Sequence, residues 1–108
     1  MISYQSTRGS RNTKTAAQAV IQGIAEDRGL YVPDSVPALP KKISDFVGKP
    51  YKEVARDIIK AFFTDYTDEE MQHCVDGAYD TKFEEEEIVP VKEAGGAYFL
   101  ELYHGKTA

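Results

Sequence analysis

Three consecutive side chains near the start of the sequence, Ser6-Thr7-Arg8, could together bind an anion. They combine two hydroxyl groups with a guanidinium group, which is well suited to bidentate binding of phosphate. Arg11 and Lys14 extend Arg8 into a short basic cluster, although such clusters more often form a solvated surface. Alternatively, Arg8 makes a salt bridge, and Ser6 and Thr7 satisfy the backbone of a turn. The residues alone leave both interpretations open.

A second candidate, His104, lies near the other end of the sequence and precedes Gly105-Lys106-Thr107. Glycine, lysine and threonine in this order are typical of a phosphate-binding loop, but that motif also requires a glycine at position 100. Because this position is Leu100, we exclude ATP binding through such a loop. On the residues alone, His104 is interpreted as a surface histidine in the turn after a strand.

The adjacent pair His73 and Cys74 does not predict a metal site. Neighbouring residues of a helix point about 100° apart, so these two side chains do not converge on one ion. No third or fourth ligand has the spacing of a zinc site. We expect Cys74 to lie on the apolar stripe of its helix as a small hydrophobic residue, and His73 to be exposed.

The composition is that of an ordinary soluble globular protein. The chain has 108 residues, which suits one domain, and a net charge of −5, which argues against nucleic acid as a partner. Its single cysteine cannot form an internal disulfide, and residues 1–5 lack the pattern of a secretory signal. No apolar run is long enough to span a membrane. We therefore expect a cytoplasmic protein without membrane contact.

Local patterns predict a strand and a helix at the start of the chain. Ile2 and Tyr4 alternate with polar residues, which is typical of a short strand. Thr13 or Thr15 can cap a helix that begins near Ala16, because a hydroxyl oxygen can accept from a backbone N–H at a helix start.

A turn at residues 26–29 is expected to lead into a second strand at residues 30–32. In this turn, Gly29 is expected to adopt a positive φ and Asp27 to hydrogen-bond nearby backbone. Pro33 ends the strand because it has no N–H. Further prolines predict an extended connection up to residue 40.

Two amphipathic helices and a hairpin are predicted for the rest of the chain. Apolar residues recur at three- and four-residue steps in residues 51–63 and 71–79, so the two helices should pack together. Thr67 and Glu70 have the spacing of a capping box, and Gly95-Gly96 predicts a hairpin turn. The sequence thus predicts a small single α+β domain with about three helices and short strands, including a C-terminal hairpin.

Three segments, at residues 4–9, 19–33 and 101–108, read YQSTRG, AVIQGIAEDRGLYVP and ELYHGKTA. In this order they resemble Y-x-S-T-R-G, A-x-x-x-G-[LI]-A-x-D-[GR]-G-L-[YF]-[VI]-P and the start of E-L-[FY]-H-G-x-T-x-A-F-K-D in threonine synthases, which are fold-type II pyridoxal-phosphate enzymes. The segments span nearly the whole chain, which makes the match specific. One departure is Lys106, where many members of the family have proline.

The resemblance implies that residues 1–108 are the N-terminal domain of a threonine synthase, truncated just before the lysine that carries pyridoxal phosphate. Such an enzyme converts O-phosphohomoserine and water to L-threonine and phosphate, and is a carbon–oxygen lyase acting on phosphates. We expect no catalytic residue, bound cofactor or metal within this part, which should be inactive alone. Its partners would be the cofactor-binding domain of the same polypeptide and O-phosphohomoserine.

The resemblance also suggests roles for the candidate residues. The family's loop after the C-terminal strand runs into the cofactor lysine, which favours His104 as a cleft residue, and an anionic substrate suits Arg8. The candidates for contact with the substrate or the cleft are Ser6, Thr7, Arg8, His104 and Thr107. We expect Asp27, Gly29 and Tyr31 to be structural, as parts of a turn that fixes the short strand.

Two alternatives to a threonine synthase domain remain open from the sequence. The same N-terminal segment could serve a threonine-synthase-like pyridoxal-phosphate lyase that acts on another substrate. The chain could also be a free-standing, non-catalytic interaction module, which the well-formed pair of amphipathic helices would support.

Overall fold

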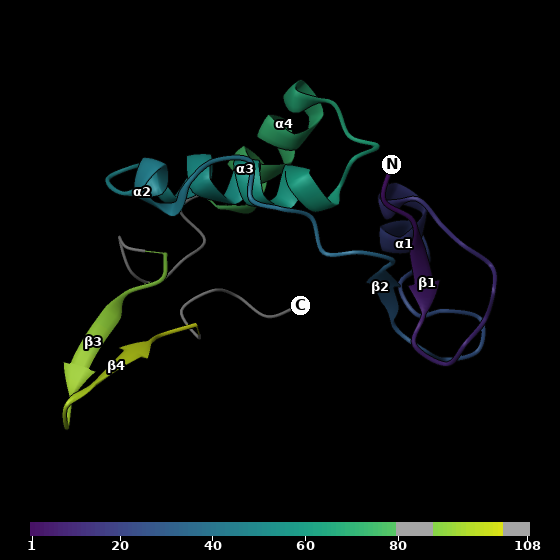
Figure 1. The fold of residues 1–108 in the computed structure, drawn as a ribbon, viewed down its shortest axis with the longest axis horizontal. Coiled ribbons are helices and arrows are strands. Elements are labelled where there is room, and N and C mark those ends of the chain that lie inside the picture. Colours follow the sequence, from purple (N-terminus) through teal and green to yellow (C-terminus); the bar gives the residue numbers. More distant parts are fainter. Residues whose placement is uncertain (80–87, 103–108) are drawn as a thin grey trace.

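Two short strands pair at the start of the chain (Figure 1). In the computed structural model, which describes residues 1–79 and 88–102, β1 (Tyr4–Ser6) lies antiparallel to β2 (Tyr31–Pro33). Both predicted strands are confirmed, with β2 beginning one residue later than expected. The ladder continues past Pro33, because the N–H of Asp34 donates to the carbonyl of Ser3 at 2.8 Å.

The helix α1 (Ala16–Gln22) begins at Thr15, one of the two predicted caps. The Thr15 hydroxyl accepts from the Gln18 N–H at 3.2 Å, and the Gln18 side chain accepts from the Thr15 N–H at 3.0 Å. This reciprocal pair is a capping box. The helix ends at Gly23, whose φ of 76° suits a residue without a side chain and whose N–H donates to the Ala19 carbonyl at 2.9 Å.

The predicted pair of amphipathic helices is confirmed as α3 (Tyr51–Phe62) and α4 (Asp68–Ala78), which pack against each other. The capping box of α4 also forms as predicted: the Thr67 hydroxyl accepts from the Glu70 N–H at 3.1 Å, and the Glu70 carboxylate accepts from the Thr67 N–H at 2.9 Å. In α4, Met71 is fully buried, whereas no residue of α3 is. One side of α3 is therefore covered only in part.

A fourth helix, α2 (Ile43–Phe46), lies between the proline-rich connection and α3. The sequence did not predict it, because it has one turn, and the preceding N-cap residue Lys42 makes no side-chain capping bond. An ion pair fixes the preceding connection to α3, since Lys41 Nζ lies 2.8 Å from the Asp57 carboxylate.

The loop between α3 and α4 fastens the helices to the N-terminal strand. The Tyr4 hydroxyl donates to the Phe62 carbonyl at 2.9 Å, and the Ile2 N–H donates to the Thr64 hydroxyl at 2.9 Å. The Asp65 carboxylate accepts from an N–H in the first turn of α1 at 3.0 Å. A small core forms at this junction, where Tyr4, Ala16 and Ala19 are buried against Ile2, Tyr31, Phe63 and Tyr66.

The predicted hairpin is present as β3 (Val91–Ala94) and β4 (Ala97–Leu100). Gly95 and Gly96 form its turn with positive φ values of 57° and 78°, a conformation that glycine adopts without steric cost. Every residue of both strands is exposed. Figure 1 shows the hairpin lying apart from the β1–β2 pair.

In the described part of the chain, four helices and two antiparallel strand pairs confirm the predicted α+β class, with one helix more than expected. The radius of gyration is 16.1 Å, compared with about 13 Å for a compact domain of this length. Within residues 1–79 and 88–102, no helix is long and apolar enough to cross a membrane.

Candidate functional site

The Asp27 carboxylate joins two loops beside the β1–β2 pair. Its Oδ1 accepts from the Ser6 hydroxyl at 2.5 Å and from the Gly29 N–H at 3.0 Å. Its Oδ2 accepts from the Ser10 N–H at 3.0 Å. The Ser6 hydroxyl in turn accepts from the Arg8 N–H at 3.1 Å. We call this group, which consists of Ser6, Arg8, Ser10, Asp27 and Gly29, the Asp27 cluster.

Gly29 is a glycine because the cluster leaves no room for a side chain at this position. The prediction of a positive φ at Gly29 was wrong. The residue with positive φ is its neighbour Arg28, at 68°. A Cβ atom on Gly29 would lie only 2.1 Å from the Ser6 hydroxyl oxygen and 3.1 Å from Asp27 Oδ1. The expected bond from Asp27 to nearby backbone is present, because Oδ1 accepts from the Gly29 N–H.

The hydroxyl groups of the candidates Ser6 and Thr7 both form hydrogen bonds within the chain. Ser6 is 5% exposed, and its hydroxyl both donates to Asp27 and accepts from a backbone N–H. Thr7 is exposed, and its hydroxyl accepts from the Leu30 N–H at 3.1 Å. Both hydroxyl groups therefore hold β1 and its loop against the residues before β2.

Arg8 is exposed at the edge of the Asp27 cluster. Its Nη1 donates to the Asp27 carbonyl at 3.4 Å, which is a long hydrogen bond. Among the described residues Arg8 makes no ion pair, so the salt bridge that the sequence left open is not formed there. Contact of Ser6, Thr7 or Arg8 with a ligand remains a prediction.

A second acidic side chain, Glu26, was not recognised from the sequence. Its carboxylate accepts from the Ser10 hydroxyl at 3.0 Å and from the Asn12 side-chain amide. Together Glu26 and Asp27 hold the polar loop that follows β1. The sequence features that could have indicated this contact are a polar run at residues 10–13 and two adjacent acidic residues at 26–27. No local sequence pattern shows that these two segments meet.

The hydrogen bonds of the cluster change the acidity of Asp27. The bond from the Ser6 hydroxyl, followed by those from the Gly29 and Ser10 N–H groups, lowers the pKa of the Asp27 carboxyl, although desolvation acts in the opposite direction. The ionised form is therefore favoured in the folded state. Asp27 contributes stability above its unfolded-state pKa of about 3.9, and this contribution is lost as the pH falls through the lower folded-state pKa.

Replacing Asp27 by asparagine should remove this pH-dependent contribution. We expect Asp27→Asn to be less stable than the wild type at neutral pH, and the difference to shrink as the pH falls below about 4. Denaturant unfolding at a series of pH values measures the difference. Asp45→Asn, in the exposed helix α2, serves as the matched control. A difference that stays constant from neutral to acidic pH would show that the carboxylate charge of Asp27 does not act this way.

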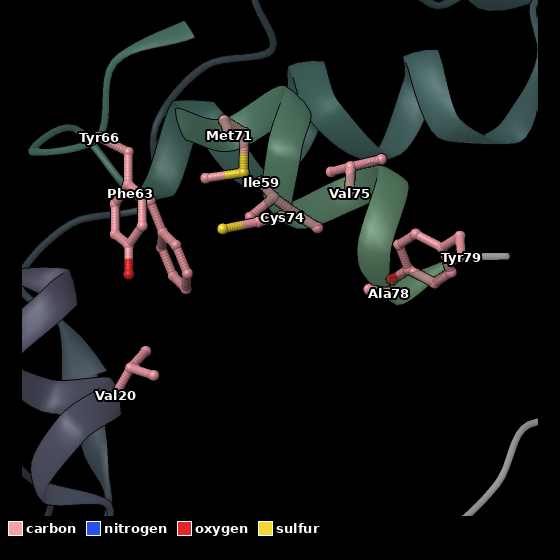
Figure 2. A pocket seen from close by; sticks show the side chains of 9 residues that line it. All are labelled: Val20, Ile59, Phe63, Tyr66, Met71, Cys74, Val75, Ala78 and Tyr79. Carbon is pink, nitrogen blue, oxygen red and sulfur yellow. The ribbon is translucent and has the colours of Figure 1, made fainter. Parts of the chain in front are cut away.

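An open apolar pocket of about 230 Å³ lies between α1, α3 and α4. Figure 2 shows that the side chains of α4 and of the end of α3 converge on it, while Val20 faces them from α1. Cys74 lies on this apolar stripe, as predicted, and is exposed there; His73 is exposed, also as predicted. The lining residues are Val20, Ile59, Phe63, Tyr66, Met71, Cys74, Val75, Ala78 and Tyr79.

Two candidate residues lie outside the described part of the chain. His104 and Thr107 fall outside residues 1–79 and 88–102, so the structure does not place them relative to Arg8. Within the described ranges, no three histidine, cysteine or acidic side chains are grouped so that they could hold a metal ion. The Asp27 cluster and the lining of the apolar pocket have no residue in common.

These features define a small α+β domain with a hydrogen-bonded polar loop and an open apolar face. A family model described as "Threonine synthase N terminus" matches residues 3–79. The chain therefore belongs to the family of threonine synthase N-terminal domains.

Relatives and a solved structure agree with this assignment. Threonine synthase from Schizosaccharomyces pombe is 34% identical over 98% of this chain and 21% of its own length. Human threonine synthase-like 1 is 31% identical over 89% of this chain and 14% of its own. The crystal structure of pyridoxal-phosphate-bound threonine synthase from Brucella melitensis superposes with a TM-score of 0.82 at 29% identity, over 98% of this chain and 23% of that one. The chain thus spans less than a quarter of the length of these proteins.

Proposed function

We propose that the chain acts as the N-terminal domain of a threonine synthase, whose whole polypeptide converts O-phosphohomoserine and water to L-threonine and phosphate. The observation that carries the proposal is the match to the family across residues 3–79, supported by the fold shared with a solved threonine synthase. We further propose that residues 1–108 form this domain. The resemblance of residues 101–108 to the family's segment would put the cofactor-carrying lysine further along the intact polypeptide.

The described residues do not fit a site for pyridoxal phosphate. Lys41 lines a surface pocket with Arg56 and Lys60, but the hydrogen bond from Lys41 to Asp57 raises the pKa of the Lys41 amine. An amine that reacts with a carbonyl must instead lose its proton readily. The apolar pocket has no cationic side chain that could hold a phosphate. We therefore assign the cofactor to the rest of the intact enzyme.

The role we propose for the Asp27 cluster is to present Arg8 to the phosphate group of the substrate. The backbone of Arg8 is fixed by its N–H bond to the Ser6 hydroxyl, and its exposed guanidinium makes only one long contact to a carbonyl. The other guanidinium donors have no partner among the described residues, so a phosphate could accept from two of them. Ser6 and Thr7 would then position the loop, and His104 and Thr107 would line the cleft as the resemblance implies.

The test is the activity of the full-length polypeptide that carries this domain. We expect it to form threonine and release phosphate from O-phosphohomoserine, and the 108-residue chain to do neither. We expect Arg8→Gln in the full-length enzyme to lower kcat/KM by roughly 10- to 100-fold, because a charge-assisted hydrogen bond contributes about 1.5–3 kcal/mol.

The matched control is Arg11→Gln, which removes an exposed guanidinium three positions away and should change kcat/KM by less than about twofold. Equal losses in the two variants would contradict the role of Arg8, because they would reflect general charge. A full-length polypeptide that is inert toward O-phosphohomoserine would contradict the proposed function itself.

A threonine-synthase-like lyase with another substrate is the second candidate. The similarity to human threonine synthase-like 1 supports it, because that protein contains a segment 31% identical to this chain. The same assay separates the two candidates: the second predicts a full-length enzyme that leaves O-phosphohomoserine intact and eliminates phosphate from a different hydroxy-amino-acid ester.

A further inference from the structure

The apolar pocket of Figure 2 continues along α3 into a second hollow. The second hollow has a volume of about 240 Å³ and shares Ile59 and Tyr79 with the first. The rings of Tyr51 and Tyr79, which both line the second hollow, meet edge to face at 5.0 Å between centroids. We call the two hollows together the apolar groove. The second hollow is lined by Tyr51, Val54, Ala55, Ile58, Ile59 and Tyr79.

The opposite, charged side of α3 is already occupied by contacts within the chain. Asp57 pairs with Lys41 at 2.8 Å, and Arg56 donates to the Gln72 side chain at 3.0 Å. Lys52 lies 3.7 Å from Asp76 of α4. Among the described residues, the polar face of the helix pair therefore has its partners, whereas the apolar face carries the two hollows.

The groove differs from a site for a small polar metabolite. Such sites combine an apolar lining with a few convergent polar groups that orient the ligand. The lining here is apolar along both hollows, apart from the Cys74 thiol and tyrosine hydroxyls. Val20 of α1, which lines the groove, is 59% exposed. A continuous apolar surface of this kind is typical of a protein interface.

The length of the solved relative favours one occupant of the groove. The same fold occurs there within a chain of which this segment covers 23%. About three quarters of such a polypeptide therefore lies outside this domain, tethered to it and present at high effective concentration. A second copy of the domain would have no such advantage.

We propose that the apolar groove is the surface on which the remaining, cofactor-binding part of a threonine synthase polypeptide packs. This inference rests on the proposed function, and it identifies where in the domain that partner binds. An apolar segment of the partner would fill the two hollows between α3 and α4 and contact Val20 of α1.

Cys74 provides a direct test, because it is the only cysteine of the 108-residue chain and lies in the groove with its thiol exposed. In the full-length polypeptide we expect alkylation of Cys74 by N-ethylmaleimide to be at least 100-fold slower than alkylation at position 73 in the double variant His73→Cys/Cys74→Ser. Position 73 is exposed on the same helix but does not line the groove. Peptide mass spectrometry measures each rate separately from other cysteines. Rates within about threefold of each other would overturn the proposal.

A charge placed in the groove should release the partner. We expect Ala78→Glu to raise the alkylation rate of Cys74 by at least tenfold, because a carboxylate is costly to bury in an apolar interface. Ala78 is exposed in this chain, so the domain can fold with the substitution. His73→Glu adds the same charge outside the groove and should leave the rate unchanged. Protection that disappears on dilution would identify a second copy as the occupant and overturn the proposal.

Threonine formation measured on the same samples separates this inference from the proposed function. An active enzyme whose Cys74 reacts as fast as position 73 would overturn the groove assignment alone. A polypeptide that protects Cys74 but forms no threonine would support the groove and contradict the proposed function.

Discussion

Replacing Gly29 by alanine is expected to lower the free energy of unfolding by about 2–4 kcal/mol, because the new methyl group has no room. Its Cβ would lie 2.1 Å from the Ser6 hydroxyl oxygen and 3.0 Å from the backbone nitrogen of Arg8. The Ser6 side chain cannot rotate away without losing its bonds to Asp27 and to the Arg8 N–H. The substitution therefore combines overpacking with the loss of hydrogen bonds in the Asp27 cluster.

Denaturant unfolding of Gly29→Ala should be compared with that of Gly77→Ala. Gly77 lies in α4, and a Cβ there would meet nothing within 4 Å. Alanine is the better helix former, so Gly77→Ala is expected to raise the free energy of unfolding by about 0.5–1 kcal/mol. A Gly29→Ala variant as stable as the wild type would mean that Ser6 and Asp27 are not packed as described.

The second large effect is expected at Tyr4, which joins β1 to α1 and to the end of α3. The side chain is 7% exposed, and its ring meets that of Phe63 edge to face at 6.4 Å between centroids. Tyr4→Ala should lower the free energy of unfolding by about 3–5 kcal/mol, the usual cost of removing a buried ring. For a domain with so few buried residues, this is a large part of the total stability.

Tyr4→Phe separates the contribution of the ring from that of the hydroxyl. Phenylalanine keeps the ring but removes the donor to the Phe62 carbonyl, so a loss of only about 0.5–1.5 kcal/mol is expected. Both variants are measured by denaturant unfolding with the wild type as reference. Equal losses in Tyr4→Phe and Tyr4→Ala would show that the hydroxyl, rather than ring packing, holds this junction.

The parts of the fold that the sequence predicts are those set by short-range rules. The capping box from Thr67 to Glu70 spans one helical turn, and Gly95-Gly96 is the turn itself, so both are visible locally. The helix α2 was missed because four residues without a side-chain cap give no periodic signal. Gly29 was misjudged because turn rules consider backbone angles, whereas its constraint is the Ser6 side chain.

The candidate site shows the same limit over longer distances. The sequence pointed to Ser6 and Arg8 as polar groups in a loop, and to Asp27 as a turn residue. It did not show that Ser6 bonds to Asp27, because these residues are 21 positions apart and neither segment has a sequence pattern that predicts contact with the other. The apolar groove could not be predicted for a related reason. The apolar stripes of α3 and α4 predicted that the helices pack together, but not that part of their apolar surface would form open hollows.

The bonds between the N-terminus and the loop after α3 have a consequence for the order of folding during synthesis. The Ile2 N–H finds its acceptor 62 positions later in the chain, and the Tyr4 hydroxyl finds its own 58 positions later. The first strand can pair with Lys14 and then with the second strand as soon as residue 33 is available, but its bonds to Phe62 and Thr64 have to wait for the whole of α3. A nascent chain that stalls before residue 64 would therefore expose the Tyr4 ring and the buried face of α1, and chaperones should recognise this stage of translation.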